Sequence, residues 1–388
     1  MKCKLNRYLV LLLALAILVL PFQNARAQEA FDYEFQSKSA LLMDPVSGEV
    51  LFEYKSDEQM PIASVTKVMT LVLVMEAIDR GEIALDEVLT ISKNAAGMGG
   101  SQVLLDEGGQ YTVSDLIKSI IVASGNDASV AMAERVAGSE AAFVDRMNAR
   151  AQELGMEGTL FKNCTGLPAE GHHSTAHDVA IMSRELIKHE VYFQYSTIWL
   201  DYLQHANNRE TMLSNTNKLL QTYDGADGIK TGSTQEAGFC LSATAKRGDV
   251  RLIGVILGAP SSKVRFQEAS DLLNFGFNTF QLQSVIQPNQ VYGQSNVING
   301  KEFTVNAVTQ EGYSLLMSKN APRQVQTQVN LQQEVNAPVE QGQPLGELIV
   351  TEGDHELTRI PLIAESAVAK AEYADHLNKI LGRWFHQE

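Results

Sequence analysis

The segment from Val65 to Met75 is apolar on nearly every side, and this feature restricts the possible folds more than any other. A helix with apolar residues all round has to be buried, so other elements must enclose it. The segment begins directly after Ser64. We therefore predict a helix at the centre of a domain. Ser64 would lie at its N-terminus, where free backbone N–H groups and the positive end of the helix dipole favour developing negative charge.

Lys67 follows Ser64 by three residues, in the pattern S-x-x-K. Residues three apart lie on one face of a helix, so the Lys67 amine can reach the Ser64 hydroxyl. A lysine is a useful base only if its pKa falls, which burial and a second nearby cation would achieve. Lys230 is the predicted second cation. The pattern indicates a serine nucleophile with a lysine base, the alternative being a helix cap followed by a surface lysine.

Two further motifs follow in order along the chain, Ser124-Gly125-Asn126 and Lys230-Thr231-Gly232. The first lies between two apolar helical segments, so a simple helix–helix turn is the alternative interpretation. The second precedes a strand-like pair at 239–245 and 251–257. This context suits an edge strand that lines a cleft, in which Gly232 lets a substrate backbone approach closely. Together the three motifs predict a serine acyl-transfer site.

S-x-x-K, S-x-N and K-T-G in this order are the signature of penicillin-binding proteins and serine β-lactamases, which the chain resembles. Asn215-Thr216-Asn217-Lys218 and the segments 163–167 and 171–178 make it similar to low-molecular-weight penicillin-binding proteins of the D-alanyl-D-alanine carboxypeptidase type. The resemblance covers about 28–388. It implies an α+β, multidomain fold, with a penicillin-binding/β-lactamase-like catalytic domain built from an antiparallel sheet and helices.

The resemblance also implies a role for each motif residue. Ser64 attacks the carbonyl between the two terminal D-alanines of a peptidoglycan stem peptide, Lys67 takes its proton, and Ser124 passes a proton to the leaving amine. The oxyanion lies between the backbone N–H groups of Ser64 and Ser233. β-Lactams mimic the substrate, and no metal or other cofactor is implied. The implied substrate-binding residues are Asn126, Lys230, Thr231, Gly232, Ser233 and Arg265.

The chain departs from the family pattern at two positions. Thr216 and Ser233 stand where some relatives carry arginine and histidine, so we expect Thr231 and Arg265 to recognise the substrate carboxylate. A surface salt bridge is the alternative for Arg265. No E-x-x-L-N pattern lies between Asn126 and Lys230, which argues against an efficient β-lactamase. A D,D-endopeptidase, a weak β-lactamase and a non-catalytic peptidoglycan-binding scaffold remain the alternatives to a carboxypeptidase.

The first 27 residues read as a secretory signal peptide, with basic residues, an apolar run at 8–20 and an A-x-A site at 25–27. Its removal takes away four basic residues and no acid, so the net charge changes from −15 to −19. Such an acidic chain argues against nucleic acid as a partner. We expect an exported protein at the outer face of the cytoplasmic membrane.

Cysteines and histidines give weaker signals. Cys164 and Cys240 fit their surroundings as small apolar residues, and we expect free, buried thiols, although export would permit a disulfide. His172, His173 and His177 could suggest a metal site. The run from Thr175 to Asp178, however, is typical of a helix capping box, so we expect these histidines on a loop near the cleft.

The chain divides by composition after the predicted catalytic domain at 28–281. Strands at 39–43 and 49–54 and the hairpin after Lys230 should share one antiparallel sheet. Residues 282–365 are rich in Gln, Val and Asn and predict a small all-β domain. Residues 366–388 show helical spacing of apolar side chains. They predict an amphipathic helix that lies on the membrane surface, the alternative being a helix docked on the β-domain. The spacing is carried by Leu377, Ile380, Leu381, Trp384 and Phe385.

Overall fold

The computed structural model describes residues 31–321 and 323–375. Within these residues, no helix combines the length and the apolar character needed to cross a bilayer. The predicted signal peptide at 1–27 lies outside the described residues.

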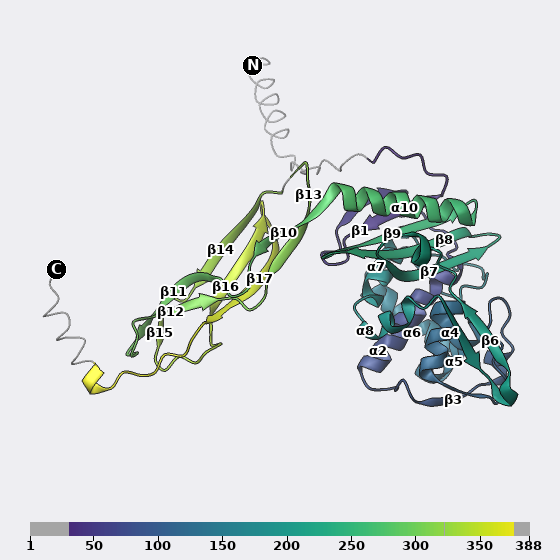
Figure 1. The fold of residues 1–388 in the computed structure, drawn as a ribbon, viewed down its shortest axis with the longest axis horizontal. Helices are drawn as coiled ribbons and strands as arrows, with labels where there is room; N and C mark the ends of the chain where they lie inside the picture. The colour runs from purple at the N-terminus through teal and green to yellow at the C-terminus, as the bar shows by residue number, and fades with distance from the viewer. Residues whose placement is uncertain (1–30, 322, 376–388) are drawn as a thin grey trace, which may run out of the picture. The chain divides into compact units, whose positions relative to one another are not determined.

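One five-stranded antiparallel sheet organises the region that carries the three motifs (Figure 1). Its strand order is β2-β1-β9-β8-β7, so the first hairpin of the chain pairs with the last strand of the late hairpin. The prediction of a single antiparallel sheet is therefore confirmed. β7, which carries Lys230-Thr231-Gly232, ends the sheet on one side. The strands are β1 (Ser39–Met43), β2 (Val50–Tyr54), β7 (Ala226–Thr234), β8 (Gly238–Arg247) and β9 (Val250–Ala259).

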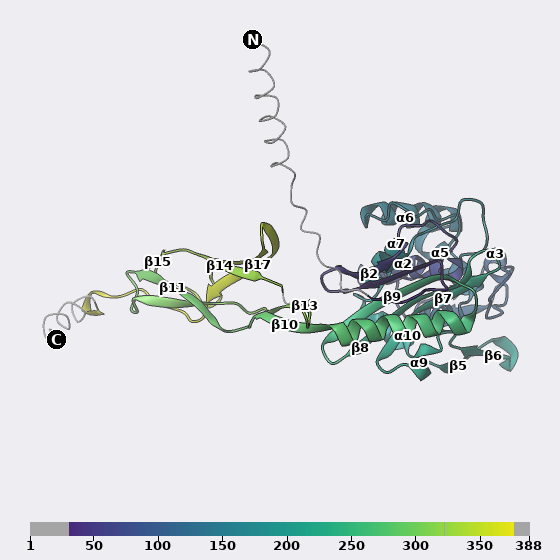
Figure 2. The same ribbon diagram turned by 90° about the horizontal axis from the view of Figure 1, so that it is seen from above.

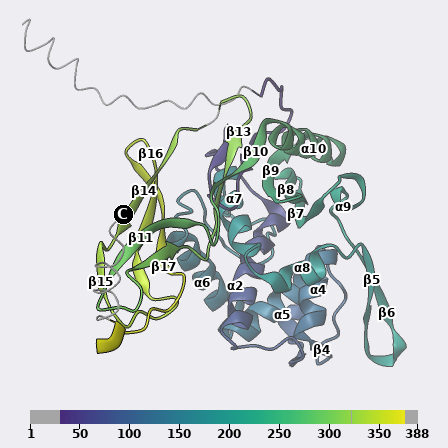
Figure 3. The ribbon, with the colours of Figure 1, turned by 60° about the vertical axis from the view of Figure 1, so that its left-hand side comes forward.

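Helices cover both faces of this sheet. α10 lies along one face, against β8 and β9, and α7 packs on the other face, against β1 and β9 (Figures 1 and 2). The longer helices are α2 (Lys67–Asp79), α4 (Val113–Ala123), α5 (Asn126–Ala137), α6 (Glu140–Glu153), α7 (Ala176–Leu186), α8 (Glu190–Ser196) and α10 (Ser262–Thr279). The short elements are η1 (Ala63–Thr66), β3 (Val88–Thr90), α3 (Lys93–Ala96), β4 (Gln110–Thr112), β5 (Leu200–Gln204), η2 (Ala206–Asn208), β6 (Glu210–Ser214) and α9 (Leu219–Thr222). β5 and β6 form a projecting hairpin (Figure 3).

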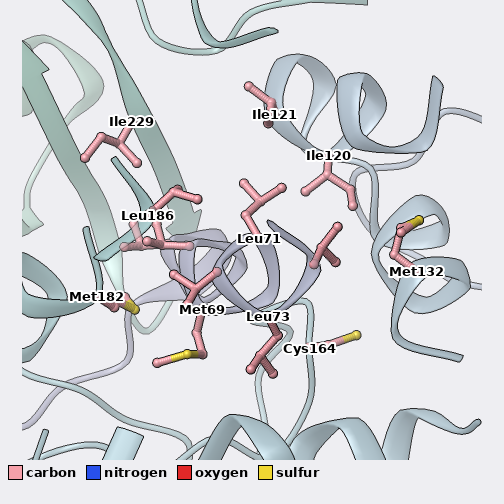
Figure 4. Close-up of a cluster of buried hydrophobic side chains, with 14 of the residues drawn as sticks. Met69, Leu71, Leu73, Ile120, Ile121, Met132, Cys164, Met182, Leu186 and Ile229 are labelled. Atoms are coloured by element: carbon pink, nitrogen blue, oxygen red, sulfur yellow. The ribbon is translucent and has the colours of Figure 1, made fainter. Parts of the chain in front are cut away.

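α2 lies at the centre of the helical layer, as its composition predicts. Every residue from Lys67 to Met75 is buried. Side chains from α4, α5, α7 and β7 surround it, including Ile120, Met132 and Met182 (Figure 4). Because no side of α2 faces solvent between Lys67 and Met75, this part of the helix can carry apolar residues on every side.

A second, all-β region follows α10 and has its own apolar core, which includes Val305, Leu345 and Leu362. The predicted all-β domain is confirmed in architecture. A six-stranded sheet has the order β14-β16-β17-β12-β11-β15, and β10 pairs with β13. The strands are β10 (Phe280–Ile286), β11 (Val291–Ile298), β12 (Thr304–Val308), β13 (Tyr313–Ser318), β14 (Val325–Leu331), β15 (Glu334–Asn336), β16 (Pro344–Glu352) and β17 (His355–Ala364).

The predicted helix at 366–388 does not begin where the sequence suggests. Val368 forms a β-bridge with Val339, and Lys370 forms one with Gly300. This part of the chain is extended because Val368 is buried in the core of the β-region. A helical turn starts only at 373, and residues 376–388, which hold the apolar stripe, lie outside the described residues.

Candidate active site

Ser64 lies in a short 3₁₀ turn, η1, directly before α2. The preceding residue, Ala63, has a φ of 48°, a left-handed conformation that costs energy for a residue with a side chain. Lys67, the first residue of α2, donates a hydrogen bond from Nζ to Ser64 Oγ at 3.0 Å. The predicted contact between the two side chains is therefore present, although a 3₁₀ turn rather than the α-helix itself holds Ser64.

Lys67 and Lys230 are both buried, with 0 % and 1 % of their surface exposed. Burial lowers the pKa of Lys67 to about 7, because an amine deprived of water loses the solvation of its charged form. Burial, and then repulsion by Lys67, lowers the pKa of Lys230 well below its usual value. Lys67 thus has the lowered pKa that a base requires, with burial rather than the second cation as the main cause.

The second motif joins α4 to α5. Ser124 adopts a left-handed conformation, with φ 61°, and its buried Oγ has no hydrogen-bond partner among the described residues. Asn126 donates from Nδ2 to the carbonyl of Gly99 at 2.7 Å, while its Oδ1 is buried and also without a described partner. Buried polar atoms are rarely left unpaired, so these two oxygens are suited to bind groups of a substrate.

The third motif brings the backbone of β7 against that of the nucleophile. A Cβ atom on Gly232 would lie 2.9 Å from the Ser64 amide nitrogen and 2.7 Å from the Ile62 carbonyl oxygen. Only glycine allows this approach. Thr231 Oγ1 lies 2.6 Å from Thr216 Oγ1. Ser233 follows on β7 with an exposed side chain.

Arg265 is buried rather than at the surface, so the salt-bridge alternative does not hold. It is 7 % exposed, and its Nη1 donates to the carbonyl oxygens of Gly232 and Cys240 at 3.0 and 3.1 Å. The guanidinium group therefore ties β7 to β8 at Gly232. Its Nε is buried without a hydrogen-bond partner among the described residues.

A loop that sequence reasoning left without a role completes the arrangement. Lys67 Nζ donates to the carbonyl oxygen of Thr165 at 2.7 Å, its shortest hydrogen bond. Asn163 Oδ1 accepts from the amides of Thr165 and Gly166 and from Thr165 Oγ1, at 2.7 to 3.1 Å. Asn163 Nδ2 donates to the Leu167 carbonyl at 2.9 Å. Asn163 thus fixes the turn whose carbonyl holds Lys67. The Asn-x-x-Gly spacing is the sequence signal for such a turn.

Replacing Asn163 by alanine should slow acylation by a β-lactam about tenfold to 100-fold, because the turn that fixes the Thr165 carbonyl loses four hydrogen bonds. The acylation rate at several pH values is the measurement, since a displaced Lys67 also shifts the pH profile. Asn148 offers a matched control, because it holds the Phe161 amide and carbonyl upstream in the same segment. Asn148→Ala should lower stability but leave the pH profile unchanged. Equal profiles for the two variants would contradict a positioning role for Asn163.

The histidines contact other protein groups. His172 Nδ1 accepts from the Lys162 amide, so the neutral imidazole carries its proton on Nε2, which lies 2.8 Å from Thr66 Oγ1. Thr175 caps α7 by accepting from the Asp178 amide, as predicted. Within 31–321 and 323–375, no three His, Cys, Asp or Glu residues lie together in a group that could hold a metal ion. Cys164 and Cys240 are free and buried, as expected.

Comparisons with known proteins agree with this geometry. Residues 23–261 match the D-alanyl-D-alanine carboxypeptidase family (peptidase S11), and residues 280–370 match the C-terminal domain of penicillin-binding protein 5. The D-alanyl-D-alanine carboxypeptidase DacF of Bacillus subtilis is 38 % identical over 385 residues, which covers 99 % of both chains. DacC of Escherichia coli is 33 % identical over 382 residues, or 96 % of this chain and 94 % of the relative.

Solved structures extend the similarity to the fold. The peptidoglycan synthesis regulatory factor PBP3 of Streptococcus pneumoniae superposes with a TM-score of 0.74 at 28 % identity, covering 87 % of this chain and all of the other. The carboxypeptidase DacD of Francisella tularensis gives a TM-score of 0.65 at 29 % identity, with 91 % and 99 % covered. Because the relatives match almost from end to end and the serine–lysine pair is in place, the chain belongs to the peptidase S11 family and is a serine-type D-alanyl-D-alanine carboxypeptidase.

Proposed function

We propose that Ser64 is the nucleophile that removes the terminal D-alanine from a peptidoglycan stem pentapeptide, with Lys67 as its base. The observation that carries this assignment is the 3.0 Å hydrogen bond between Lys67 Nζ and Ser64 Oγ. A lysine with a pKa of about 7 is half neutral near neutral pH, so it can accept the serine proton. No other group is needed as the base for the first step.

Acylation proceeds by attack of Ser64 Oγ on the carbonyl carbon between the two D-alanines. The serine proton passes to Lys67 Nζ, and the backbone N–H groups of Ser64 and Ser233 hold the oxyanion. One such donor contributes about 3–4 kcal/mol to lowering the barrier. The C–N bond then breaks, and Ser124 relays a proton to the leaving amine. Water adds to the ester, and its hydrolysis frees Ser64 and the shortened peptide.

Substrate binding follows from the groups around the nucleophile. Asn126 Oδ1 is free to accept a hydrogen bond from the N–H of the substrate amide. Thr231 and the Lys230 amine can bind the terminal carboxylate, and Gly232 lets the substrate backbone lie along β7. Arg265 acts indirectly in this scheme, since its contact with the Gly232 carbonyl fixes β7. A β-lactam enters by the same contacts and leaves a slowly hydrolysed ester on Ser64.

Incubation of the purified protein with a peptide ending in D-Ala-D-Ala, and separately with penicillin, tests this proposal. Mass spectrometry should show release of one D-alanine from the peptide and one covalent penicillin adduct on the protein. Cleavage of a crosslinked dimeric peptide without release of D-alanine would favour a D,D-endopeptidase, and rapid loss of the penicillin adduct would favour a β-lactamase. Absence of both the adduct and D-alanine release would indicate a non-catalytic scaffold.

The rate of acylation should depend on pH through Lys67. Because the neutral amine is the base, the rate should rise about tenfold per pH unit below pH 7 and level off above it. Burial lowers the pKa of His172 to about 4, so its titration falls outside this window. Stopped-flow acylation by a chromogenic β-lactam between pH 5 and pH 9 is the measurement. A flat profile across pH 7 would rule out Lys67 as the base.

We also propose export and attachment to the outer face of the cytoplasmic membrane. The sequence pattern of residues 1–27 supports export, and the apolar stripe within 376–388 supports surface attachment. Deleting residues 376–388 should move the protein from the membrane to the soluble fraction without loss of D-alanine release. Unchanged membrane association of this shortened chain would contradict the tail as the anchor.

A further inference from the structure

The β-region ends on one side in a strand with an open edge, β14. Its single partner in the sheet is β16, and in Figure 1 it lies on the outer side of that strand. Residues 326–330 are all exposed, and 42 % of the surface of Val329 is exposed. No backbone hydrogen bond from 325–331 to any described residue other than those of β16 is present. A row of N–H and C=O groups along β14 is thus available to another strand.

Two other strands at sheet margins, β15 and β2, are protected in ways that β14 is not. β15 is three residues long and carries Glu334, with Pro338 two residues beyond its end. β2 carries Glu53, and its pairing with β1 contains a register shift. Short length, charge, proline and bulges are the features that prevent strands from pairing edge to edge. Val325–Leu331 has seven residues, no charge and no proline.

The sequence of β14 is complementary to itself. Val325-Gln326-Thr327-Gln328-Val329 reads the same in both directions. If two copies of this strand pair antiparallel about Thr327, valine lies opposite valine, glutamine opposite glutamine and threonine opposite threonine. Aliphatic pairs, amide pairs and threonine pairs are favourable neighbours across antiparallel strands. The uncharged strand β10 lacks this symmetry, since Leu282 and Ser284 flank its centre at Gln283.

We propose that β14 pairs antiparallel with β14 of a second copy of this chain, around a two-fold axis at Thr327. A two-fold contact uses the same patch on both partners, which is what a palindromic strand provides. The two six-stranded sheets would then join into one continuous sheet. This inference concerns the β-region alone and does not depend on the assignment of Ser64.

The contact should be weak and should depend on salt. One pair of seven-residue strands buries less than the roughly 1,200 Å² that stable interfaces bury, so dimers should form only at high local concentration. Two chains that each carry a net charge of −15 repel one another at long range. Screening of this repulsion should strengthen the association as ionic strength rises. A contact held together by pairs of opposite charges would instead weaken as ionic strength rises.

Single-cysteine crosslinking tests the register. In a full-length Cys3→Ala chain, Thr327→Cys should form a disulfide-linked dimer under mild oxidation, because directly opposed residues lie within disulfide range. Gln326→Cys and Gln328→Cys should not crosslink alone, since position 326 of one copy lies opposite position 328 of the other. A mixture of these two variants should crosslink. Gln283→Cys on the exposed strand β10 is the control and should stay monomeric. Equal crosslinking of all four single-cysteine variants, or none in Thr327→Cys, would overturn the proposal.

Sedimentation equilibrium of the chain without added cysteines provides the independent measurement. Thr327→Lys should weaken self-association at least tenfold, because two lysines would meet at the axis, while D-alanine release stays unchanged. A chain that remains monomeric up to its solubility limit would overturn the proposal and would leave a strand from a different protein as the occupant of this edge. Loss of D-alanine release with intact dimers would count against the proposed function instead.

Discussion

Replacing Ser64 by alanine is expected to reduce release of D-alanine by roughly 10⁴- to 10⁶-fold, as removal of a nucleophile does in other serine hydrolases. The hydroxyl that Lys67 contacts at 3.0 Å would be missing, so no acyl-enzyme could form. Mass spectrometry after incubation with penicillin should show no adduct. The melting temperature should change little, because Ser64 Oγ makes no other hydrogen bond within the described part of the chain.

Ser233→Ala is the matched control for this experiment. Ser233 is next to the site on β7 and its side chain is exposed, but its proposed contribution is the backbone N–H alone. Removal of its hydroxyl should leave acylation within about threefold of the original rate, since the backbone N–H is kept and the side chain is exposed. An unchanged penicillin adduct on Ser64→Ala would show that a different residue is the nucleophile.

Replacing Gly166 by alanine is expected to have the largest structural effect at the site. Gly166 has a φ of 82°, and a Cβ there would lie 1.9 Å from the Ala63 carbonyl oxygen and 2.9 Å from the Ser64 amide nitrogen. These are backbone atoms, so they can move only if the turn that carries Ser64 moves. We expect a destabilisation of about 3–5 kcal/mol, at the high end for single substitutions. Acylation should slow by about 100-fold, because a nucleophile displaced by 1 Å loses alignment.

The variant Gly171→Ala measures the cost of backbone strain without a steric clash. Gly171 has a similar φ of 77°, but the nearest atom to an added Cβ is Lys162 Cε at 3.4 Å, at the end of a flexible side chain. Gly171→Ala should lower the free energy of unfolding only by the cost of the left-handed conformation, about 1–2 kcal/mol. Its acylation rate should not change. Thermal unfolding and penicillin acylation rates, measured on both variants, make the comparison. If both variants acylate at the original rate, close contact between Gly166 and the nucleophile turn is not needed for catalysis.

Much of the fold could be predicted, because short sequence patterns indicate where helices, strands and turns form. The uniform apolar character of 65–75 predicted a helix enclosed on all sides, and α2 is buried over its length to Met75. Alternation and turn signals placed both hairpins of the antiparallel sheet. The start of the predicted helix at 366–388 was the main error. Residues 366–372 have a composition compatible with a helix. Val368, however, is buried and forms a β-bridge with Val339, and this tertiary contact overrides the local preference for a helix.

The sequence by itself determined the chemistry of the site, because the pairing of Ser64 with Lys67 needs only residues three apart. The order of the three motifs likewise identified the family. Only the tertiary structure decided how Lys67 is held, since the Thr165 carbonyl reaches it from 98 residues away. It also decided that Arg265 binds the Gly232 carbonyl from beside the sheet. Contacts between distant segments depend on how whole elements pack, and no local spacing records that packing.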